Sequence, residues 1–368
     1  MRDARLEKFA KLLVHYCLGV EKGETVLLRG ETVAEPLIRE FYAETLRAGG
    51  HPMLRLMLPG MIETFYDAAS KHQLEYACPF ALREIEGVDK VMSIRATDNT
   101  KALSSIDPKK QAVARKAQTT WLQTFRNRSA AGDLRWSLTQ FPCDAYAQDA
   151  EMSLPEYEDF VFRACMLHRK DPVAAWRGVH RKQAKYCKRL GQAKKLRIVR
   201  EGTDLTMSVA GRTWINSDGR TNMPSGEVFT GPVEDSVEGT IRYSFPAIWS
   251  GREVTGIQLT FKQGKVVKAT ADKGEDFLHA TLDTDPGARF VGEVAVGTNY
   301  NIQRFTKNIL FDEKIGGTVH IAVGASYPQS GGKNTSSVHW DMITDMRDGG
   351  RIYADGKVIY KDGQFVLD

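Results

Sequence analysis

The sequence lacks the features that mark membrane proteins, disulfide-rich secreted proteins and thiolate zinc proteins. Its 368 residues contain no run of eighteen apolar residues, so we expect no membrane span. Only five cysteines occur and none forms a CxxC pair, which argues against a disulfide framework and a thiolate zinc site. Residues 1–8 mix charges and lack the apolar centre of a signal peptide. We therefore expect a cytoplasmic protein with reduced thiols.

Common catalytic and nucleotide-binding motifs are also missing. No GxGxxG follows the early strand patterns, no GxSxG elbow occurs, and the HExxH motif is absent. Residues 331–336 (GGKNTS) look like part of a phosphate-binding loop, but Tyr327 stands at the first glycine position and Asn334 follows the lysine. These absences argue against dinucleotide binding, a serine-hydrolase elbow and a zincin.

Charge is mild overall but uneven along the chain. The net charge is +5, and 26% of residues are charged, as in ordinary globular proteins. Basic residues concentrate between positions 163 and 200. Nucleic-acid binding is one interpretation of this segment, and a solvated helix face is the other. Because aromatic residues are not regularly interleaved with the basic ones, we favour the solvated face and expect no nucleic-acid partner.

Helical and strand patterns alternate through the first half of the chain. Apolar residues recur at helical spacing over 4–19 and about 34–48. Residues 25–29 are typical of a buried strand, and residues 53–57 are the next strand pattern. Residues 107–128 and 154–193 also have helical patterns, and further strand patterns cover residues 90–94 and 134–138. This alternation predicts a parallel sheet covered by helices.

After about residue 195 helical periodicity fades and glycine becomes more frequent. Residues 253–271 and 351–360 are typical of hairpins, the second with a turn at Asp355–Gly356. A chain of this length also favours two domains. The predicted fold class is therefore α/β: an N-terminal parallel-sheet α/β domain over residues 1–193, followed by a β-rich α+β catalytic domain over residues 194–368.

The most informative pair in the sequence is His339 and Asp341, two residues apart. On an extended segment, residues at this spacing point to the same side. An imidazole and a carboxylate aimed at one point are suitable ligands for a zinc- or cobalt-type cation. The alternative for this pair alone is a hydrogen-bonded pair at the surface.

Other ligand-type residues lie upstream in glycine-rich settings. Glu227 lies on a loop stiffened by proline and glycine, Glu293 begins a run that is typical of a buried strand, and His320 lies inside an apolar strand pattern. Each has a plain structural alternative: a solvated turn acid, an exposed strand end and a packed core histidine. Glu313 and Tyr327 by themselves are typical of a turn acid and a packing aromatic residue. Together, the set predicts a metal-dependent hydrolase.

The same segments, taken in order, resemble a known family. The similarity lies in NMPSGEVFTGPVEDSVEG (222–239), GEVAVGTN (292–299), NILFDEKIGGTVHIAVGASYP (308–328) and GGKNTSSVHWDMI (331–343), and more weakly in VEKGETVLLRG (20–30). Together they resemble the aminopeptidase T family of metalloaminopeptidases, which also includes aminopeptidase S and PepS.

The resemblance implies a cytoplasmic homodimeric exopeptidase with two adjacent divalent ions per subunit, which are zinc, cobalt, manganese or magnesium. It implies a set of metal ligands: Glu227, Glu293, His320, Tyr327, His339 and Asp341. It also implies that Glu293, Glu313 and Tyr327 take part in catalysis, with Glu313 a further ligand or the proton carrier.

The expected activity is a metal-dependent aminopeptidase that releases N-terminal residues from peptides through a two-metal-activated water. The expected partners are peptides with a free N-terminus and a second copy of the chain. Two alternatives remain open at the level of sequence: a metallo-amidohydrolase with another substrate, and a non-catalytic α/β protein that binds peptides or anions.

Overall fold

The computed structural model describes residues 3–366, which form two compact units. The first unit runs up to Ala174 and also includes Gly219–Pro224, and the second comprises Ala175–Asp218 and the chain from Ser225 onward. The division into domains at residues 193 and 194 stays a prediction. Most of helix α10 (Pro172–Leu190) belongs to the second compact unit.

The first unit alternates strands and helices. Its strands are β1 (Thr25–Glu31), β2 (His51–Met57), β3 (Lys90–Arg95), β4 (Arg135–Gln140) and β8 (Asn222–Met223). Its helices are α1 (Ala4–Lys11), the π-helix η1 (Leu12–Leu18), the 3-10 helix η2 (Thr32–Ala34), α2 (Glu35–Arg47), α3 (Met61–Ala68), α4 (Lys71–Leu74), α5 (Pro79–Gly87), α6 (Pro108–Ala117), α7 (Thr119–Ala131), α8 (Asp144–Asp149) and α9 (Leu154–Ala164).

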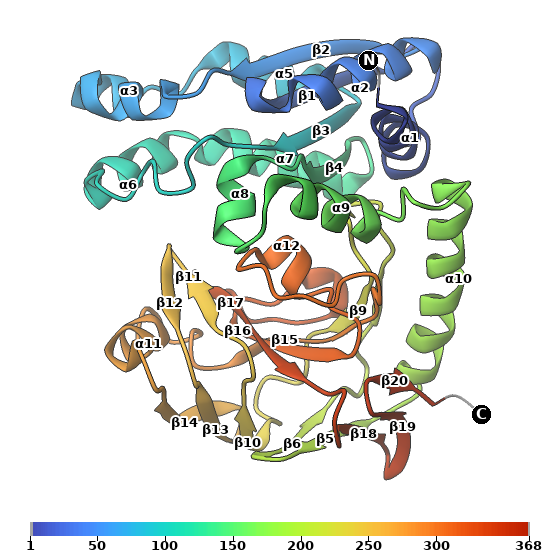
Figure 1. The fold of residues 1–368 in the computed structure, drawn as a ribbon. Helices are drawn as coiled ribbons and strands as arrows, with labels where there is room; N and C mark the ends of the chain where they lie inside the picture. Colours follow the sequence, from blue (N-terminus) through green and yellow to red (C-terminus); the bar gives the residue numbers. More distant parts are fainter. Residues whose placement is uncertain (1–2, 367–368) are drawn as a thin grey trace. The chain divides into compact units, whose positions relative to one another are not determined.

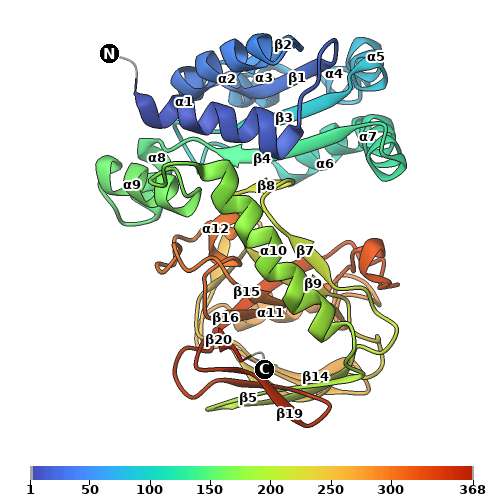
Figure 2. The same cartoon turned by 90° about the vertical axis from the view of Figure 1, so that its right-hand side faces the viewer.

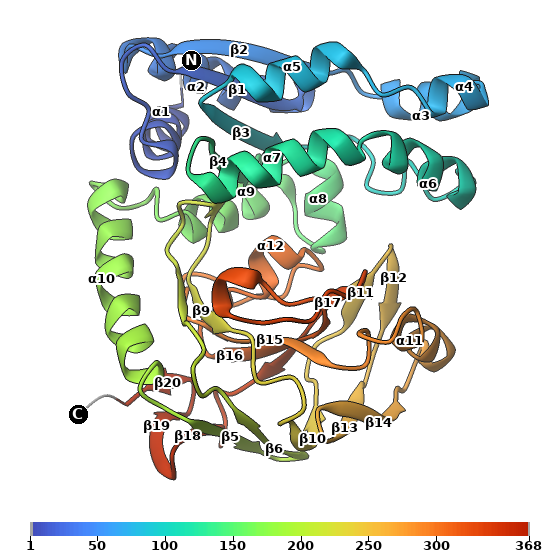
Figure 3. The same ribbon diagram turned by 180° about the vertical axis from the view of Figure 1, so that it is seen from behind.

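These strands form one parallel sheet in the order β2-β1-β3-β4-β8. Helices α5 and α7 lie side by side over one face (Figure 3), where Ile85 and Trp121 pack with Leu27 and Val91. Helix α2 and the π-helix η1 contact the strands from the other side. The helical pattern over 154–193 corresponds to two helices, because the chain takes a positive φ at Met166 and α10 begins only at Pro172.

The second unit is rich in antiparallel strands. They are β5 (Lys195–Arg200), β6 (Thr203–Ser208), β7 (Ile215–Ser217), β9 (Glu227–Thr230), β10 (Glu238–Arg242), β11 (Ala247–Trp249), β12 (Arg252–Val254), β13 (Gln258–Lys262), β14 (Lys265–Thr270), β15 (Val291–Gly297), β16 (Thr318–Gly324), β17 (His339–Asp345), β18 (Arg351–Ala354), β19 (Lys357–Lys361) and β20 (Gln364–Phe365). Its helices are α10, α11 (Glu275–Leu282), α12 (Ile309–Asp312) and the 3-10 helix η3 (Pro328–Ser330).

Two sheets of this unit share one hydrophobic core. One has the order β14-β13-β10-β6-β5-β18-β19-β20, and the other has the order β17-β16-β15-β9-β7. Val294, Ile321 and Trp340 of the second sheet are buried in the same cluster as Ile198 and Leu259 of the first. Figure 1 shows α12 on the opposite side of the β15–β17 sheet from β5 and β6. The predicted fold class, a parallel α/β region followed by a β-rich region, is confirmed.

Helix α10 carries much of the basic segment (Figure 2). Its basic residues include Arg177, Arg181, Lys182, Lys185, Lys188 and Arg189. Trp176, Gln183 and Tyr186 are buried on its other side, so the basic residues form a solvated face. The absence of a nucleic-acid partner stays a prediction. Within residues 3–366, no helix has the length and apolar character needed to cross a bilayer.

Candidate metal centre

One face of the sheet β17-β16-β15-β9-β7 brings together five of the six predicted ligands, all except Tyr327. Side chains alternate between faces along a strand, and directly paired residues of neighbouring strands share a face. Glu293 pairs with Ala322, and Ala322 pairs with Asp341, so these residues stand in a row across three strands. His320 lies two residues before Ala322, and His339 lies two residues before Asp341. Both imidazoles therefore share the face of the two carboxylates.

Glu227 joins the same face from a fourth strand. It pairs with Gly297, which lies four residues after Glu293 on β15. Small residues occupy the positions between the acids and the imidazoles: Ala295, Gly297, Ala322 and Gly324. The face, here called the ligand face, therefore has room above the backbone at its centre.

Glu293 and Asp341 each place one carboxylate oxygen near His320 and the other near His339. Glu293 Oε1 lies 3.4 Å from His320 Nε2, and Glu293 Oε2 lies 3.4 Å from His339 Nε2. Asp341 repeats this arrangement at 3.9 Å and 3.6 Å, and Glu227 Oε2 lies 3.6 Å from His320 Nε2. These separations are long for hydrogen bonds. Ligand atoms about 2.0–2.2 Å from one tetrahedral ion lie about 3.3–3.6 Å apart, so most of these separations suit ligands that share ions.

Two carboxylate oxygens of this cluster have no hydrogen-bond partner in the described part of the chain. Glu227 Oε2 and Asp341 Oδ1 are both buried without one among the described residues, and a buried oxygen in that state is costly. A divalent cation would satisfy both atoms. Three residue sets have ligand atoms within 4.8 Å of one another: Glu227 with Glu293 and His320; Glu293 with His339 and Asp341; and Glu313 with His320 and Asp341.

The two imidazoles are held differently. His339 Nδ1 donates to the carbonyl of Ala325 at 2.8 Å, so the lone pair of Nε2 faces the carboxylates. His320 is 1% exposed, and its Nδ1 has no hydrogen-bond partner among the described residues. The backbone contact therefore orients His339, whereas packing in β16 orients His320.

Burial and the charges of neighbouring groups shift the pKa values of the cluster. Burial raises the pKa of Glu293 to about 7, although His320 opposes the shift. Burial lowers the pKa of His320, but Glu293, Glu227 and Asp341 outweigh it and raise the pKa to about 9. The protein without metal therefore favours extra protons here, and a divalent cation supplies the same positive charge.

Lys314 is a further residue of this site that the sequence analysis did not single out. It follows α12, is 1% exposed, and its Nζ donates to Glu227 Oε1 at 2.7 Å. The same ammonium contacts Glu313 Oε1. Burial lowers the pKa of Lys314, but the charges of Glu227 and Glu313 outweigh it and raise the pKa above its ordinary value. A lysine in sequence between an acid and an isoleucine gives no signal that it is buried.

Tyr327 borders the cluster. Its ring lies edge-on to the His339 ring, with centroids 5.1 Å apart, and the Phe229 ring lies 5.4 Å away. Although 44% of Tyr327 is exposed, burial of the rest and the charges of Glu293 and Asp341 raise the pKa of its phenol well above the ordinary value. Without a cation, Tyr327 therefore stays a neutral phenol at neutral pH.

Supporting contacts fix the segments around the cluster. Gln183 Nε2 donates to the Glu227 carbonyl at 3.0 Å and to Asn216 Oδ1 at 2.7 Å. Asp312 accepts from the backbone N–H and hydroxyl of Thr306 at 2.7 and 2.8 Å. A small pocket of about 20 Å³ lies beside Asp341, with mostly apolar walls that include Phe305. Gln183, like Lys314, was not among the site residues predicted from the sequence, because its contact with Glu227 depends on where α10 packs.

The model of the thermophilic metalloprotease (M29) family matches residues 2–365 of the sequence. The chain therefore belongs to this family of metal-dependent peptidases. The resemblance and the enzyme class inferred from the sequence motifs are confirmed.

Curated relatives and a solved structure agree with this assignment. Aminopeptidase 2 of Geobacillus stearothermophilus is 29% identical, over 98% of this chain and 95% of its own length. Aminopeptidase T of Thermus thermophilus is 30% identical, over 95% of each chain. The solved structure of wild-type AmpT from Thermus thermophilus covers 99% of both chains with a TM-score of 0.85 at 26% identity.

Proposed function

We propose that this chain is an aminopeptidase that hydrolyses the first peptide bond of peptides with a free N-terminus. The relatives named above are aminopeptidases, and the matching family is one of metalloproteases. The observation that carries the proposal is the ligand face itself. There, acids and imidazoles from four adjacent strands converge at distances suited to shared ions.

We propose two divalent ions per subunit. The pairing of atoms supports this number, because Glu293 and Asp341 each direct one oxygen toward His320 and the other toward His339. One ion would be held by Glu227, Glu293 and His320, and the other by Glu293, His339 and Asp341. The ligand atoms are oxygen and nitrogen, which suits zinc, cobalt, manganese or magnesium.

The ions, when bound, would lower the pKa of a water molecule and polarise the scissile carbonyl. Glu293 and Asp341, each with one oxygen toward His320 and the other toward His339, would contribute ligands to both ions. Glu313 lies at the edge of the cluster and is part exposed, with its Oε1 held by Lys314. We assign it the transfer of a proton to the leaving amine. Tyr327 would bind at the same centre or donate its hydroxyl to the carbonyl oxygen as negative charge develops there.

A chelation experiment tests the proposal. The protein should hydrolyse leucyl- and arginyl-amide substrates, lose that activity with a chelator, and regain it with Zn²⁺ or Co²⁺. A peptide with a free N-terminus should be cleaved, and the same peptide with an acetylated N-terminus should not. Equal cleavage of both would favour an amidohydrolase instead. No cleavage in the metal-loaded protein would contradict the enzymatic proposal.

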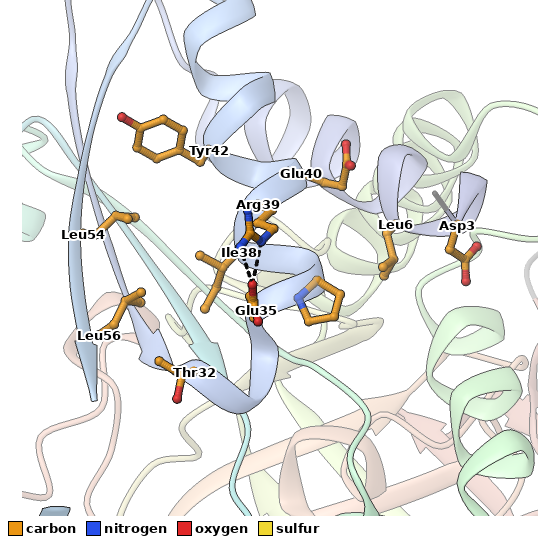
Figure 4. Close-up of a pocket in the computed structure, with 11 residues that line it drawn as sticks. Asp3, Leu6, Thr32, Glu35, Ile38, Arg39, Glu40, Tyr42, Leu54 and Leu56 are labelled. Atoms are coloured by element: carbon orange, nitrogen blue, oxygen red, sulfur yellow. Dashed lines mark hydrogen bonds and ion pairs between the residues drawn. The ribbon is translucent and has the colours of Figure 1, made fainter. Parts of the chain in front are cut away.

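We further propose a homodimer formed through the first unit. Strand β2 is an edge of the parallel sheet, and it exposes Leu54 and Leu56. They line a pocket of about 1120 Å³ together with Ile38 and Tyr42 of α2 (Figure 4). An exposed apolar edge strand is a surface that a second copy would cover. Light scattering should show a dimer for the native protein and weaker dimerisation for Leu54→Asp, and a native monomer would contradict the proposed dimer.

The cytoplasmic location stays a prediction from sequence.

A further inference from the structure

Lys314 is a buried cation in direct contact with the predicted ligand set. Its Nζ donates to Glu227 Oε1 at 2.7 Å and contacts Glu313 Oε1. At 1% exposure it is one of the largest fully buried side chains in the described part of the chain. Lysine is rarely buried completely unless its ammonium is paired, and here two carboxylates pair with it.

The contact gives the two oxygens of Glu227 different partners. Oε1 accepts from the ammonium, whereas Oε2 is buried, has no hydrogen-bond partner among residues 3–366, and lies 3.6 Å from His320 Nε2. A carboxylate held in this way offers one oxygen to a cation. Without Lys314 both oxygens would be available, and the side chain would be able to rotate between one-oxygen and two-oxygen contact with an ion.

The backbone around Lys314 is suited to fixing this geometry. Lys314 N donates to the carbonyl of Phe311 at 3.0 Å, and Asn299 N donates to the carbonyl of Lys314 at 3.1 Å. Asn299 also donates through Nδ2 to the Ser225 carbonyl at 2.9 Å. A Cβ on Gly226, which has a φ of +115°, would lie 2.8 Å from Asn299 Cβ. The segments that carry Lys314 and Glu227 are therefore tied together through Asn299.

We propose that Lys314 is a positioning residue of the metal centre. It holds Glu227 so that Oε2 alone faces the ions, and it links that ligand to Glu313. The inference rests on the proposed function only in that the site binds divalent cations. A simpler role makes the opposite prediction: if the ammonium only offsets negative charge, it repels cations, and its removal strengthens their binding.

Metal affinity of Lys314→Met tests the proposal without relying on activity. We expect affinity for Zn²⁺, measured by competition with a chromogenic chelator, to fall about 10–100-fold, as for other residues that orient a ligand. We also expect the visible absorption spectrum of the Co²⁺-loaded protein to change, because the coordination by Glu227 changes. Lys314→Gln keeps a donor without the charge, so its affinity should lie between those of Lys314→Met and the native protein.

A double variant shows whether Lys314 acts through Glu227. If it does, Lys314→Met should have little further effect on metal affinity when combined with Glu227→Gln. Lys90→Met is a matched control, because Lys90 pairs with Glu24 at 3.1 Å at a part-buried position in the first unit. It should leave metal affinity unchanged. Circular dichroism and unfolding temperature should identify any variant that fails to fold. If Lys314→Met fails to fold, the comparison is made between Lys314→Gln and the native protein.

The outcomes separate this inference from the proposed function. Equal or tighter metal binding by folded Lys314→Met, with an unchanged Co²⁺ spectrum, would overturn the role of Lys314 and leave the aminopeptidase proposal intact. Metal binding by the native protein without peptide hydrolysis would reject the peptidase proposal, and the Lys314 comparison would remain valid. A native protein that binds no divalent cation would overturn both.

Discussion

The two faces of the sheet β17-β16-β15-β9-β7 carry different kinds of side chain. One face packs Val294, Ile321 and Trp340 into the common hydrophobic core. The ligand face carries acids and imidazoles, with alanine or glycine between them. Adjacent residues of one strand thus lie on opposite faces. The core face stabilises the fold, and the ligand face holds the predicted metal ligands.

This difference explains why the site tolerates so much buried charge. Burial of several carboxylates together is unfavourable, and the opposite face offsets this by burying large apolar side chains on the same strands. The two roles can be tested separately, because a substitution on one face should affect metal binding and a substitution on the other should affect stability.

The largest effect is expected on the ligand face at Glu293. Glu293→Gln removes the charge of a carboxylate that spans both imidazoles, so both predicted ions lose a ligand. We expect the loss of peptidase activity to exceed the roughly 10–100-fold loss typical of residues that only support a ligand, with less metal bound by elemental analysis. Asp345→Asn is the control, because Asp345 lies on the same sheet but pairs with Arg347. Full activity in Glu293→Gln would reject the catalytic assignment.

A substitution on the opposite face should lower stability and leave metal binding unchanged. Ile321→Ala, next to His320 in β16, removes a fully buried side chain. The cavity should cost about 2–5 kcal/mol of unfolding free energy, measured by urea denaturation. Metal content per folded chain should remain native. If Ile321→Ala lost metal at native stability, the separation of roles between the faces would be wrong.

A substitution at one of the small residues of the ligand face should affect both stability and metal binding. Ala322 stands between Glu293 and Asp341 in the row across three strands, and Ala322→Val adds two methyl groups there. We expect an overpacking cost of about 1–3 kcal/mol. We also expect weaker Zn²⁺ binding in a chelator competition, because the added bulk would fill space proposed for the metal. Ala322→Gly leaves the space open and should bind Zn²⁺ more tightly than Ala322→Val. Equal binding by the two variants would show that this space is not used.

The sequence predicts part of this arrangement from local pattern alone. The spacing of His339 and Asp341 correctly predicts one shared strand face, because alternation along a strand is a local property. The strand–helix alternation of the first half likewise predicts the parallel sheet. Glu227 and Glu293 join the pair only through the register of β9, β15, β16 and β17, and the sequence did not reveal that register. The family resemblance, rather than periodicity, indicated that they act together.

Features that depend on packing were not predictable. Lys314 appears in sequence as one more charged residue, and its burial depends on where α12 places it against Glu227. Gln183 lies in a strongly basic helix, and only the side on which α10 packs makes it a partner of β9. The break between α9 and α10 depends on the positive φ at Met166 and on Pro172. A helical pattern alone does not show these breaks.

The smallest expected effect is the pH dependence of the protein without metal. The pKa of His320 is raised to about 9 in the folded protein, compared with about 6.5 in an unfolded chain. The stabilisation from this protonated imidazole is complete below pH 6.5 and is lost as the pH rises through 9. A bound cation replaces the proton, so the metal-loaded protein should not show this loss. The gap in Tm between protein with Zn²⁺ and protein with chelator should therefore widen from pH 6.5 to pH 9, by about 2–4 °C for each kcal/mol involved. A gap that narrows over this range would show that His320 is not among the carboxylates of the ligand face in solution.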